Sequence, residues 1–172
     1  MQQRFGAFFH IPEGGTNADA VRGCEEILGE GDFSFDYICC ACGTGGTVAG
    51  LSRSASGHQK ILAFASVRDE SVRQTIAGFS ERDNWDLVSD FDFGGYGKVT
   101  SELIQFINDF KSRHGIALDP VYTGKMMFGV MSLIRDGFFK PNTRILAIHT
   151  GGLQGIAGMN LRLGKANLPL IT

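Results

Sequence analysis

The sequence predicts an α/β domain with a mostly parallel sheet and helices on both faces, formed by residues 1–172 as a single domain. Short apolar runs alternate with helical patterns along the chain, and this order is typical of parallel sheets. The run Tyr37–Ala41 is apolar at every position, as expected for a central strand that is covered on both faces. Further strands are expected at Gly6–Ile11, Lys60–Ser66, Asp86–Ser89 and Arg144–Ile148, and helices at Ala18–Leu28, Val48–Ser54, Glu70–Phe79, Val99–Arg113, Gly124–Ile134 and after Gln154.

Length, composition and charge describe a globular protein. The chain has 172 residues, of which 43% are hydrophobic and 20% are charged, and this is enough for one domain with a core. The formal net charge of −2 provides no basic excess to neutralise phosphates, which argues against a nucleic-acid partner or a membrane surface. No apolar run approaches the ~20 residues of a membrane span, and Met1–His10 lack the features of a signal peptide. We therefore expect a cytoplasmic protein.

Three of the four cysteines, Cys39, Cys40 and Cys42, fall in one apolar run, whereas Cys24 lies in a predicted helix. A zinc site usually needs a second pair of ligands elsewhere in the chain, and neighbouring positions on a strand point to opposite faces. We therefore expect buried, reduced thiols and no metal site, with metal or redox chemistry as the alternative.

The turn Cys42–Thr47, with the sequence Cys-Gly-Thr-Gly-Gly-Thr, stands between a predicted strand and a predicted helix. Successive glycine N–H groups can converge on an anion, and the helix N-terminus adds partial positive charge. Thr44 and Thr47 can donate hydroxyl hydrogen bonds to the same group. The turn lacks the Gly-Lys-Ser/Thr of a Walker loop, and Val48 replaces the third small residue of a dinucleotide fingerprint. The pattern alone indicates either a phosphate cradle or a tight structural turn.

A second glycine-rich turn, His149–Gln154, follows the last predicted strand. In open parallel sheets, ligands bind beyond the carboxyl ends of the strands, where both turns are expected to lie. The two turns therefore mark the predicted site.

Five segments resemble pyridoxal-phosphate (PLP) enzymes of the tryptophan-synthase-β-like fold, in the branch of D-cysteine desulfhydrases and 1-aminocyclopropane-1-carboxylate deaminases. The segment Cys-Gly-Thr-Gly-Gly-Thr-Val-Ala-Gly-Leu is similar to the phosphate loop of these enzymes. The segments occur in family order, and the resemblance covers nearly the whole chain. They are Ile11–Asn17, Cys42–Leu51, Tyr96–Gly97, Leu118–Lys125 and His149–Leu153.

The resemblance implies PLP as the cofactor and places Thr123 opposite its pyridine nitrogen. Deaminases that open a cyclopropane ring carry Glu there, and a carboxylate favours a protonated ring and a stronger electron sink. A threonine hydroxyl suits β-elimination, and Thr150, where those deaminases tend to carry Leu, points the same way. The implied reaction converts D-cysteine or a related amino acid to pyruvate, ammonia and sulfide. The implied cofactor-binding residues are Gly43, Thr44, Gly45, Gly46, Thr47, Thr123, Thr150 and Gly151.

Tyr122 and Tyr96 resemble the family's active-site tyrosines, which flank substrate and cofactor and can take part in proton transfer. Without the resemblance, the favoured interpretation of each is a half-buried tyrosine with a satisfied hydroxyl. We interpret His149 as a hydrogen-bonding residue at a strand end, Lys125 as a structural or charge-supporting residue, and Asp119 as a turn residue.

The family's Schiff-base lysine and the Ser-Asn loop that grips the substrate carboxylate lie upstream in a longer chain, and neither motif occurs here. We therefore expect the later part of a large domain, without the first part of that domain and the small domain, and no turnover by the chain alone. Three explanations are a fragment of a full enzyme, a natural short protein that has lost catalysis, and half of a split enzyme. The full-length enzyme is expected to be a homodimer that acts on a small amino acid.

Alternative functions follow from the same glycine turns. The first is a non-catalytic domain that binds a phosphate ligand such as a nucleotide or sugar phosphate. The second is a pure assembly domain, and the third is a 1-aminocyclopropane-1-carboxylate deaminase.

Overall fold

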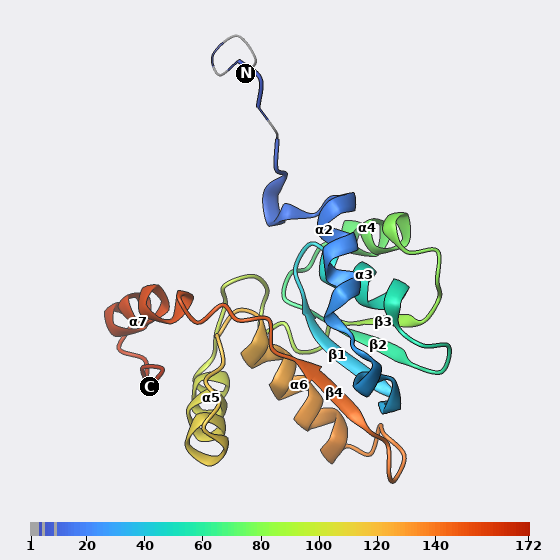
Figure 1. The fold of residues 1–172 in the computed structure, drawn as a ribbon. Coiled ribbons are helices and arrows are strands. Elements are labelled where there is room, and N and C mark those ends of the chain that lie inside the picture. Colours follow the sequence, from blue (N-terminus) through green and yellow to red (C-terminus); the bar gives the residue numbers. More distant parts are fainter. Residues whose placement is uncertain (1–3, 5, 9) are drawn as a thin grey trace.

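The computed structural model describes residues 4, 6–8 and 10–172, which form an α/β domain around a four-stranded sheet (Figure 1). The strand order is β3-β2-β1-β4, and every neighbouring pair is parallel. The predicted fold class is confirmed. The strands are β1 (Tyr37–Cys42), β2 (Lys60–Ala65), β3 (Trp85–Val88) and β4 (Ile145–Ile148).

The order in which the chain builds the sheet reverses next to β1. From β1 the chain moves outward to β2 and then β3, and it returns through two helices to add β4 on the other side of β1. Such a reversal is a topological switch point, and open α/β sheets bind ligands beyond the carboxyl ends of the strands at that point. The topology therefore directs attention to the connections that follow β1 and β4.

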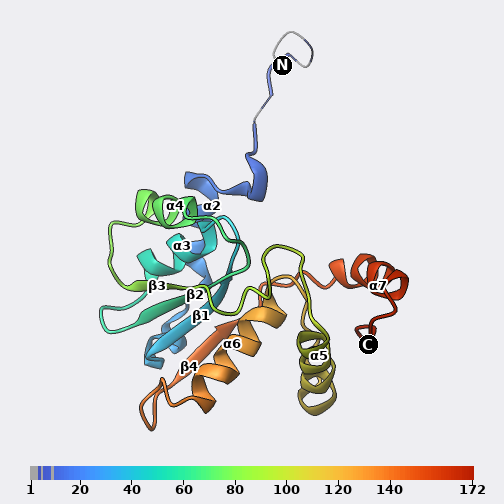
Figure 2. The ribbon, with the colours of Figure 1, turned by 180° about the vertical axis from the view of Figure 1, so that it is seen from behind.

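Helices cover both faces of the sheet, as Figures 1 and 2 show from opposite sides. Helices α2, α3 and α4 pack together over one face, and α6 lies against β1 and β2 on the other. Helices α5 and α7 contribute to a separate apolar cluster around Leu103, Ile107 and Met159. Of the helices in the described ranges, none is long and apolar enough to cross a membrane. The helices are α2 (Ala18–Cys24), α3 (Gly46–Ser54), α4 (Ser71–Phe79), α5 (Ser101–His114), α6 (Thr123–Arg135) and α7 (Gly155–Lys165), with short 3-10 helices at Glu13–Gly15, Glu25–Ile27 and Glu30–Ser34.

The cysteines of β1 fill both sides of the core. Cys40 and Cys42 pack with the α3 and α4 side, whereas Cys39 packs with Met126 and Val130 of α6. This alternation confirms that neighbouring cysteines face opposite sides of the sheet. Burial raises the pKa of the Cys39 and Cys42 thiols to about 12, so both stay protonated at neutral pH. The expected buried thiols are confirmed for these strand positions.

The predicted helix at 18–28 begins as expected, because the Asn17 side chain accepts a hydrogen bond from the Ala20 N–H at 2.9 Å. The predicted strand Gly6–Ile11 is wrong for its described residues, which are not in a strand, while residue 9 lies outside the described residues. A strand needs a neighbour to pair with, and the described residues of this segment pair with no strand of the sheet. The described residues here extend away from the sheet (Figure 1).

Candidate functional site

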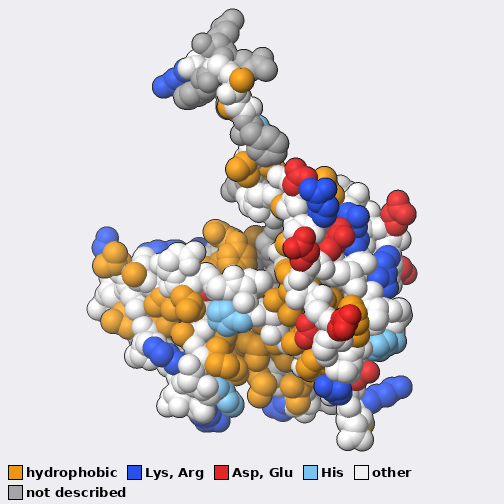
Figure 3. All heavy atoms as spheres, viewed as in Figure 1, with side chains coloured by type: hydrophobic (Ala, Val, Ile, Leu, Met, Phe, Trp, Pro, Cys, Tyr) orange, Lys and Arg blue, Asp and Glu red, His pale blue; other side chains and the backbone are white. Residues whose placement is uncertain are grey.

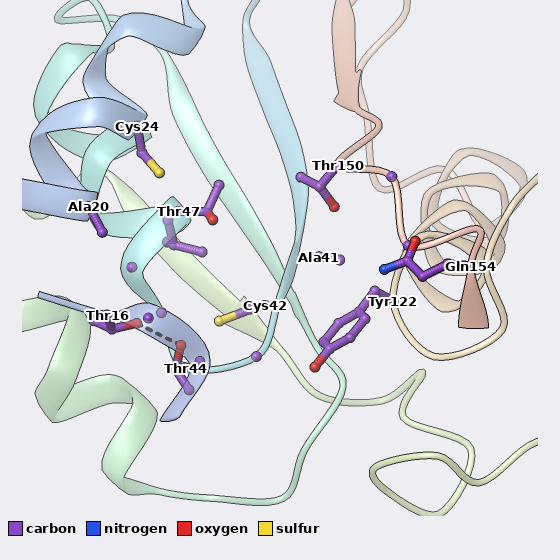
Figure 4. A pocket seen from close by; sticks show the side chains of 18 residues that line it. Thr16, Ala20, Cys24, Ala41, Cys42, Thr44, Thr47, Tyr122, Thr150 and Gln154 are labelled. Atoms are coloured by element: carbon purple, nitrogen blue, oxygen red, sulfur yellow. Dashed lines mark hydrogen bonds between the residues drawn. The ribbon is translucent and has the colours of Figure 1, made fainter. Parts of the chain in front are cut away.

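A cavity of about 500 Å³ opens beyond the carboxyl ends of β1 and β4 (Figure 4). Both predicted glycine-rich turns contribute to its wall, because β1 and β4 are adjacent and parallel. The two turns therefore lie side by side, as expected, and their role as a binding site stays a prediction. The sequence-predicted residues that line the cavity are Gly43, Thr44, Gly45, Gly46, Thr47, Tyr122, Thr150 and Gly151.

In the turn after β1, backbone atoms of glycine residues line the cavity without side chains in the way. Gly45 has a φ of +95°, which favours glycine, and it directly precedes the first residue of α3. A side chain at Gly45 would stand 2.8 Å from Ile76, and one at Gly46 would stand 2.9 Å from the Thr16 hydroxyl. The first N–H groups of α3 have no partner within the helix. This part of the turn therefore presents hydrogen-bond donors where no side chain fits.

Residues 12–17 form a second wall, in a segment that the sequence marked only by its resemblance to the family. Gly14, Gly15 and Thr16 line the cavity, and the Thr16 and Thr44 hydroxyl oxygens are 2.6 Å apart. A methyl group on Gly14 would stand 2.5 Å from Cγ2 of Thr44, so the two segments are in close contact. The signal that could have revealed this wall is the pair of glycines followed by threonine at 14–16, which repeats at 45–47.

Charged side chains are missing from the lining of this cavity, as far as the described residues go. Gln154, which the sequence analysis did not single out, is a polar side chain that reaches it (Figure 4). An anion here would meet backbone N–H groups, hydroxyls and the helix dipole, without a carboxylate to repel it. None of the chain's six lysines lines the cavity.

Tyr122 and Tyr96 come together from different elements. Their rings pack edge to face with centroids 6.0 Å apart, and a methyl group on Gly43 would stand 3.2 Å from Cε1 of Tyr122. Tyr122 lines the first cavity and a second one of about 480 Å³, whereas Tyr96, which is 63% exposed, lines only the second. Burial first, and then the adjacent Tyr96 hydroxyl, raises the pKa of Tyr122 to about 12. Tyr122 therefore keeps its proton at neutral pH.

Thr123 lies behind the cavity wall and is fully buried. Its hydroxyl donates a hydrogen bond of 2.7 Å to the Asp119 carboxylate and accepts one of 2.9 Å from the Asp119 N–H. The position of Thr123 opposite a pyridine nitrogen stays a prediction.

Asp119 organises the start of α6, a role beyond the turn residue that the sequence indicated. Its buried carboxylate accepts hydrogen bonds of 2.8 Å from the N–H groups of Val121, Tyr122 and Thr123. The pattern Asp-Pro before an apolar helical run could have revealed this, because it is typical of a helix start. Asp119 thereby fixes the backbone that carries Tyr122.

Lys125 fixes the other tyrosine. Its buried ammonium donates hydrogen bonds of 2.7 Å and 2.8 Å to the carbonyls of Asp92 and Gly95, in the loop that carries Tyr96. Burial lowers the pKa of Lys125, and the nearby Asp92 and Asp119 charges oppose this only partly. The Asp92 carboxylate also accepts hydrogen bonds from the Arg68 guanidinium and from Gly94 N–H. The predicted structural role of Lys125 is confirmed by these contacts.

His149 holds the second glycine turn in place. Its Nε2 lies 2.8 Å from the Ala117 carbonyl, and its Nδ1 accepts a hydrogen bond of 3.1 Å from the Gly151 N–H. Nε2 therefore carries the proton, and the predicted hydrogen-bonding role at a strand end is confirmed. The described part of the chain has no group of three or more His, Cys, Asp or Glu that could hold a metal ion.

Comparisons with known proteins identify relatives of the chain. Residues 3–151 match the protein family described as "Pyridoxal-phosphate dependent enzyme". A Pyrococcus horikoshii protein provisionally named 1-aminocyclopropane-1-carboxylate deaminase is 36% identical over 84% of this chain and 49% of its own length. An Arabidopsis thaliana protein named bifunctional D-cysteine desulfhydrase/1-aminocyclopropane-1-carboxylate deaminase, mitochondrial, is 35% identical over 85% of this chain and 42% of its own length.

A solved structure shows the same fold. A crystal structure described as that of an ACC deaminase homologue matches with a TM-score of 0.73 and 33% identity, over 91% of this chain and 51% of that chain. The chain thus spans about half the length of the curated relatives it matches.

Proposed function

Because this chain belongs to the pyridoxal-phosphate dependent enzyme family, we propose that its turn Gly43–Thr47 holds the phosphate group of that cofactor. The observation that carries the proposal is a glycine cradle at the N-terminus of α3, facing a cavity whose described lining has no charged side chain. A phosphate fits such a donor set, because backbone N–H groups and threonine hydroxyls can surround its oxygens. A side chain at Gly46 would meet the Thr16 hydroxyl at the cavity wall, whereas one at Gly45 would meet Ile76 of α4.

Residues of the turn after β4 would hold the ring of the cofactor in this proposal. Thr150 and Gly151 line the cavity opposite the cradle, and the Thr150 hydroxyl has no hydrogen-bond partner among the described residues. The Thr123 hydroxyl hydrogen, in contrast, is already committed to Asp119. Thr150 is therefore the better donor to an unprotonated pyridine nitrogen, with Thr123 behind it. When bound, the cofactor supplies an electron sink for carbanion chemistry.

Tyr122 is the acid–base group that we assign to this chain. Its pKa of about 12 means that Oη holds a proton at neutral pH, and the ring lies against the glycine turn. A group that stays protonated beside the reacting centre can donate a hydrogen bond or a proton to a leaving group. Tyr96, more exposed and packed against Tyr122, lines the second cavity.

For the whole protein we propose the β-elimination of D-cysteine or a related amino acid to pyruvate, ammonia and sulfide. The neutral hydroxyls of Thr123 and Thr150 support elimination over cyclopropane opening, because neither provides a negative charge to protonate the ring. In this proposal residues 1–172 form the later part of the large domain. The family resemblance also supports a homodimeric, cytoplasmic enzyme.

The chain alone is expected to lack turnover. With PLP and D-cysteine added, it should release no sulfide above a protein-free control, because none of its six lysines lines the cavity. The measurement is sulfide release over time. Sulfide release by the pure chain, abolished by Tyr122→Phe, would contradict the expectation.

The substrate is tested in a protein that joins this chain to the part of the Pyrococcus horikoshii relative that it does not match. Sulfide from D-cysteine is expected to form faster than ammonia from 1-aminocyclopropane-1-carboxylate. A Thr150→Leu version is the matched control and should lose part of the sulfide release. Faster turnover of the cyclopropane substrate would favour the deaminase, the function that names several relatives.

A further inference from the structure

The hydroxyl of Thr16 lies at the mouth of the glycine cradle. Its oxygen would be 2.9 Å from a methyl group on Gly46, so it stands directly beside the buried backbone that begins α3. Thr16 lines the same cavity as the cradle, although it precedes the cradle by about 30 residues in the chain. Figure 4 shows it next to Thr44, with the hydrogen bond drawn between them.

The two hydroxyls of Thr16 and Thr44 together have one more hydrogen than their mutual hydrogen bond needs. Each hydroxyl carries one hydrogen, and the 2.6 Å contact uses one of the two. The second hydrogen stays available for a ligand in the cavity. A hydroxyl that accepts a hydrogen bond is a stronger donor, because neighbouring hydrogen bonds polarise each other. The pair therefore offers one strengthened donor to an anion.

The segment that carries Thr16 is shaped for this approach. Gly14 has a φ of +71° and would place a methyl group 2.5 Å from Cγ2 of Thr44, so a side chain at Gly14 would push the segments apart. Asn17 directly follows Thr16 and caps α2, which fixes the direction of the chain beyond the contact. These two constraints, one on each side of Thr16, fix the position of its hydroxyl relative to the cradle.

We propose that Thr16 is a phosphate-binding residue, which completes the cradle by donating to the bound phosphate monoester directly or through Thr44. This inference rests on the proposed phosphate site and assigns it a residue from outside the glycine turn Gly43–Thr47. The opposite role, a hydroxyl that blocks the cradle, predicts tighter binding when the hydroxyl is removed.

The test measures binding of inorganic phosphate and pyridoxine 5′-phosphate to the full chain by isothermal titration calorimetry. Thr16→Val should weaken both affinities about tenfold, in the range expected for a hydrogen bond to a charged group. Thr16→Ser keeps the hydroxyl and should bind within about twofold of wild type. Thr143→Val, which lies just before the amino end of β4 and so at the end of the strands opposite the cradle, is the matched control and should leave binding unchanged.

Three results separate the possibilities. Equal binding by Thr16→Val and wild type, or tighter binding by Thr16→Val, would overturn the role of Thr16 while leaving the phosphate site intact. A wild-type chain that binds neither ligand would overturn the phosphate site itself. If Thr16→Val lowers the melting temperature, Thr16→Ala is compared with Thr16→Ser below both transitions, and equal affinities of these two variants overturn the proposal.

Discussion

Replacing Asp119 with alanine is expected to lower the free energy of unfolding by about 3 kcal/mol, because buried N–H groups lose a charged acceptor. The carboxylate accepts three backbone hydrogen bonds and one from the Thr123 hydroxyl, and its side chain is almost fully buried. Its removal leaves the first turn of α6 without a cap and frees the backbone of Tyr122. Urea-induced unfolding, followed by circular dichroism, measures the loss.

Two variants control for the Asp119 result. Asp119→Asn keeps the shape and one acceptor oxygen, so about half of the loss is expected. Asp136→Ala removes an exposed carboxylate at the other end of the same helix and should change stability by less than about 0.5 kcal/mol. A loss of less than about 0.5 kcal/mol for Asp119→Ala would show that the cap does not hold α6.

Replacing Lys125 with methionine is expected to lower the free energy of unfolding by about 2–3 kcal/mol, because the carbonyls of Asp92 and Gly95 lose a buried, charged donor. Methionine has a similar length, so little volume is lost and the effect reports the hydrogen bonds. The larger consequence is local, because these two bonds tie the loop that carries Tyr96 to α6. Hydrogen exchange at residues 92–97 should become faster in this variant.

Lys98 provides the matched control in the same region. It is exposed, and Lys98→Met should leave both the unfolding free energy and the exchange of residues 92–97 close to wild type. Unchanged exchange in Lys125→Met would contradict the anchoring role, even if the variant were less stable. If both the unfolding free energy and the exchange were unchanged, Lys125 would have no structural role at the site.

The sequence predicted the elements whose signals are local. The all-apolar run at Tyr37–Ala41 indicated a buried parallel strand, and the glycines at 43–47 indicated a turn into a helix. The expected strand at Gly6–Ile11 was wrong because a strand also depends on a neighbour, which the pattern of one segment does not reveal. Its apolar residues resembled a strand, but the described residues of this segment extend away from the sheet and pair with none of its strands (Figure 1).

The contacts that complete the site were not predictable in the same way. Thr16 meets Thr44 across 28 positions of sequence, and Lys125 meets Asp92 across 33, so no short pattern contains either pair. Thr123 was expected to face the cofactor, and the structure shows that its hydroxyl hydrogen belongs to a bond with Asp119. Such competition for a single hydrogen is visible only when the neighbours are in place. The residue types in the sequence indicated where the site lies. The role of each residue in it depends on tertiary contacts that the sequence pattern does not contain.

The central claim is that the cradle at Gly43–Thr47 binds the phosphate group of the cofactor. Titration with pyridoxine 5′-phosphate and with pyridoxine, which both lack an aldehyde and cannot react with surface lysines, measures that group alone. We expect pyridoxine 5′-phosphate to bind and to be displaced by inorganic phosphate, and we expect pyridoxine to bind far more weakly. Gly46→Ala is expected to lose the phosphate-dependent affinity, because its methyl group would stand 2.9 Å from the Thr16 hydroxyl oxygen. Gly78→Ala, where a methyl group meets nothing within 4 Å, should bind like wild type. Equal affinity for pyridoxine and its phosphate, or full binding by Gly46→Ala, would contradict the claim.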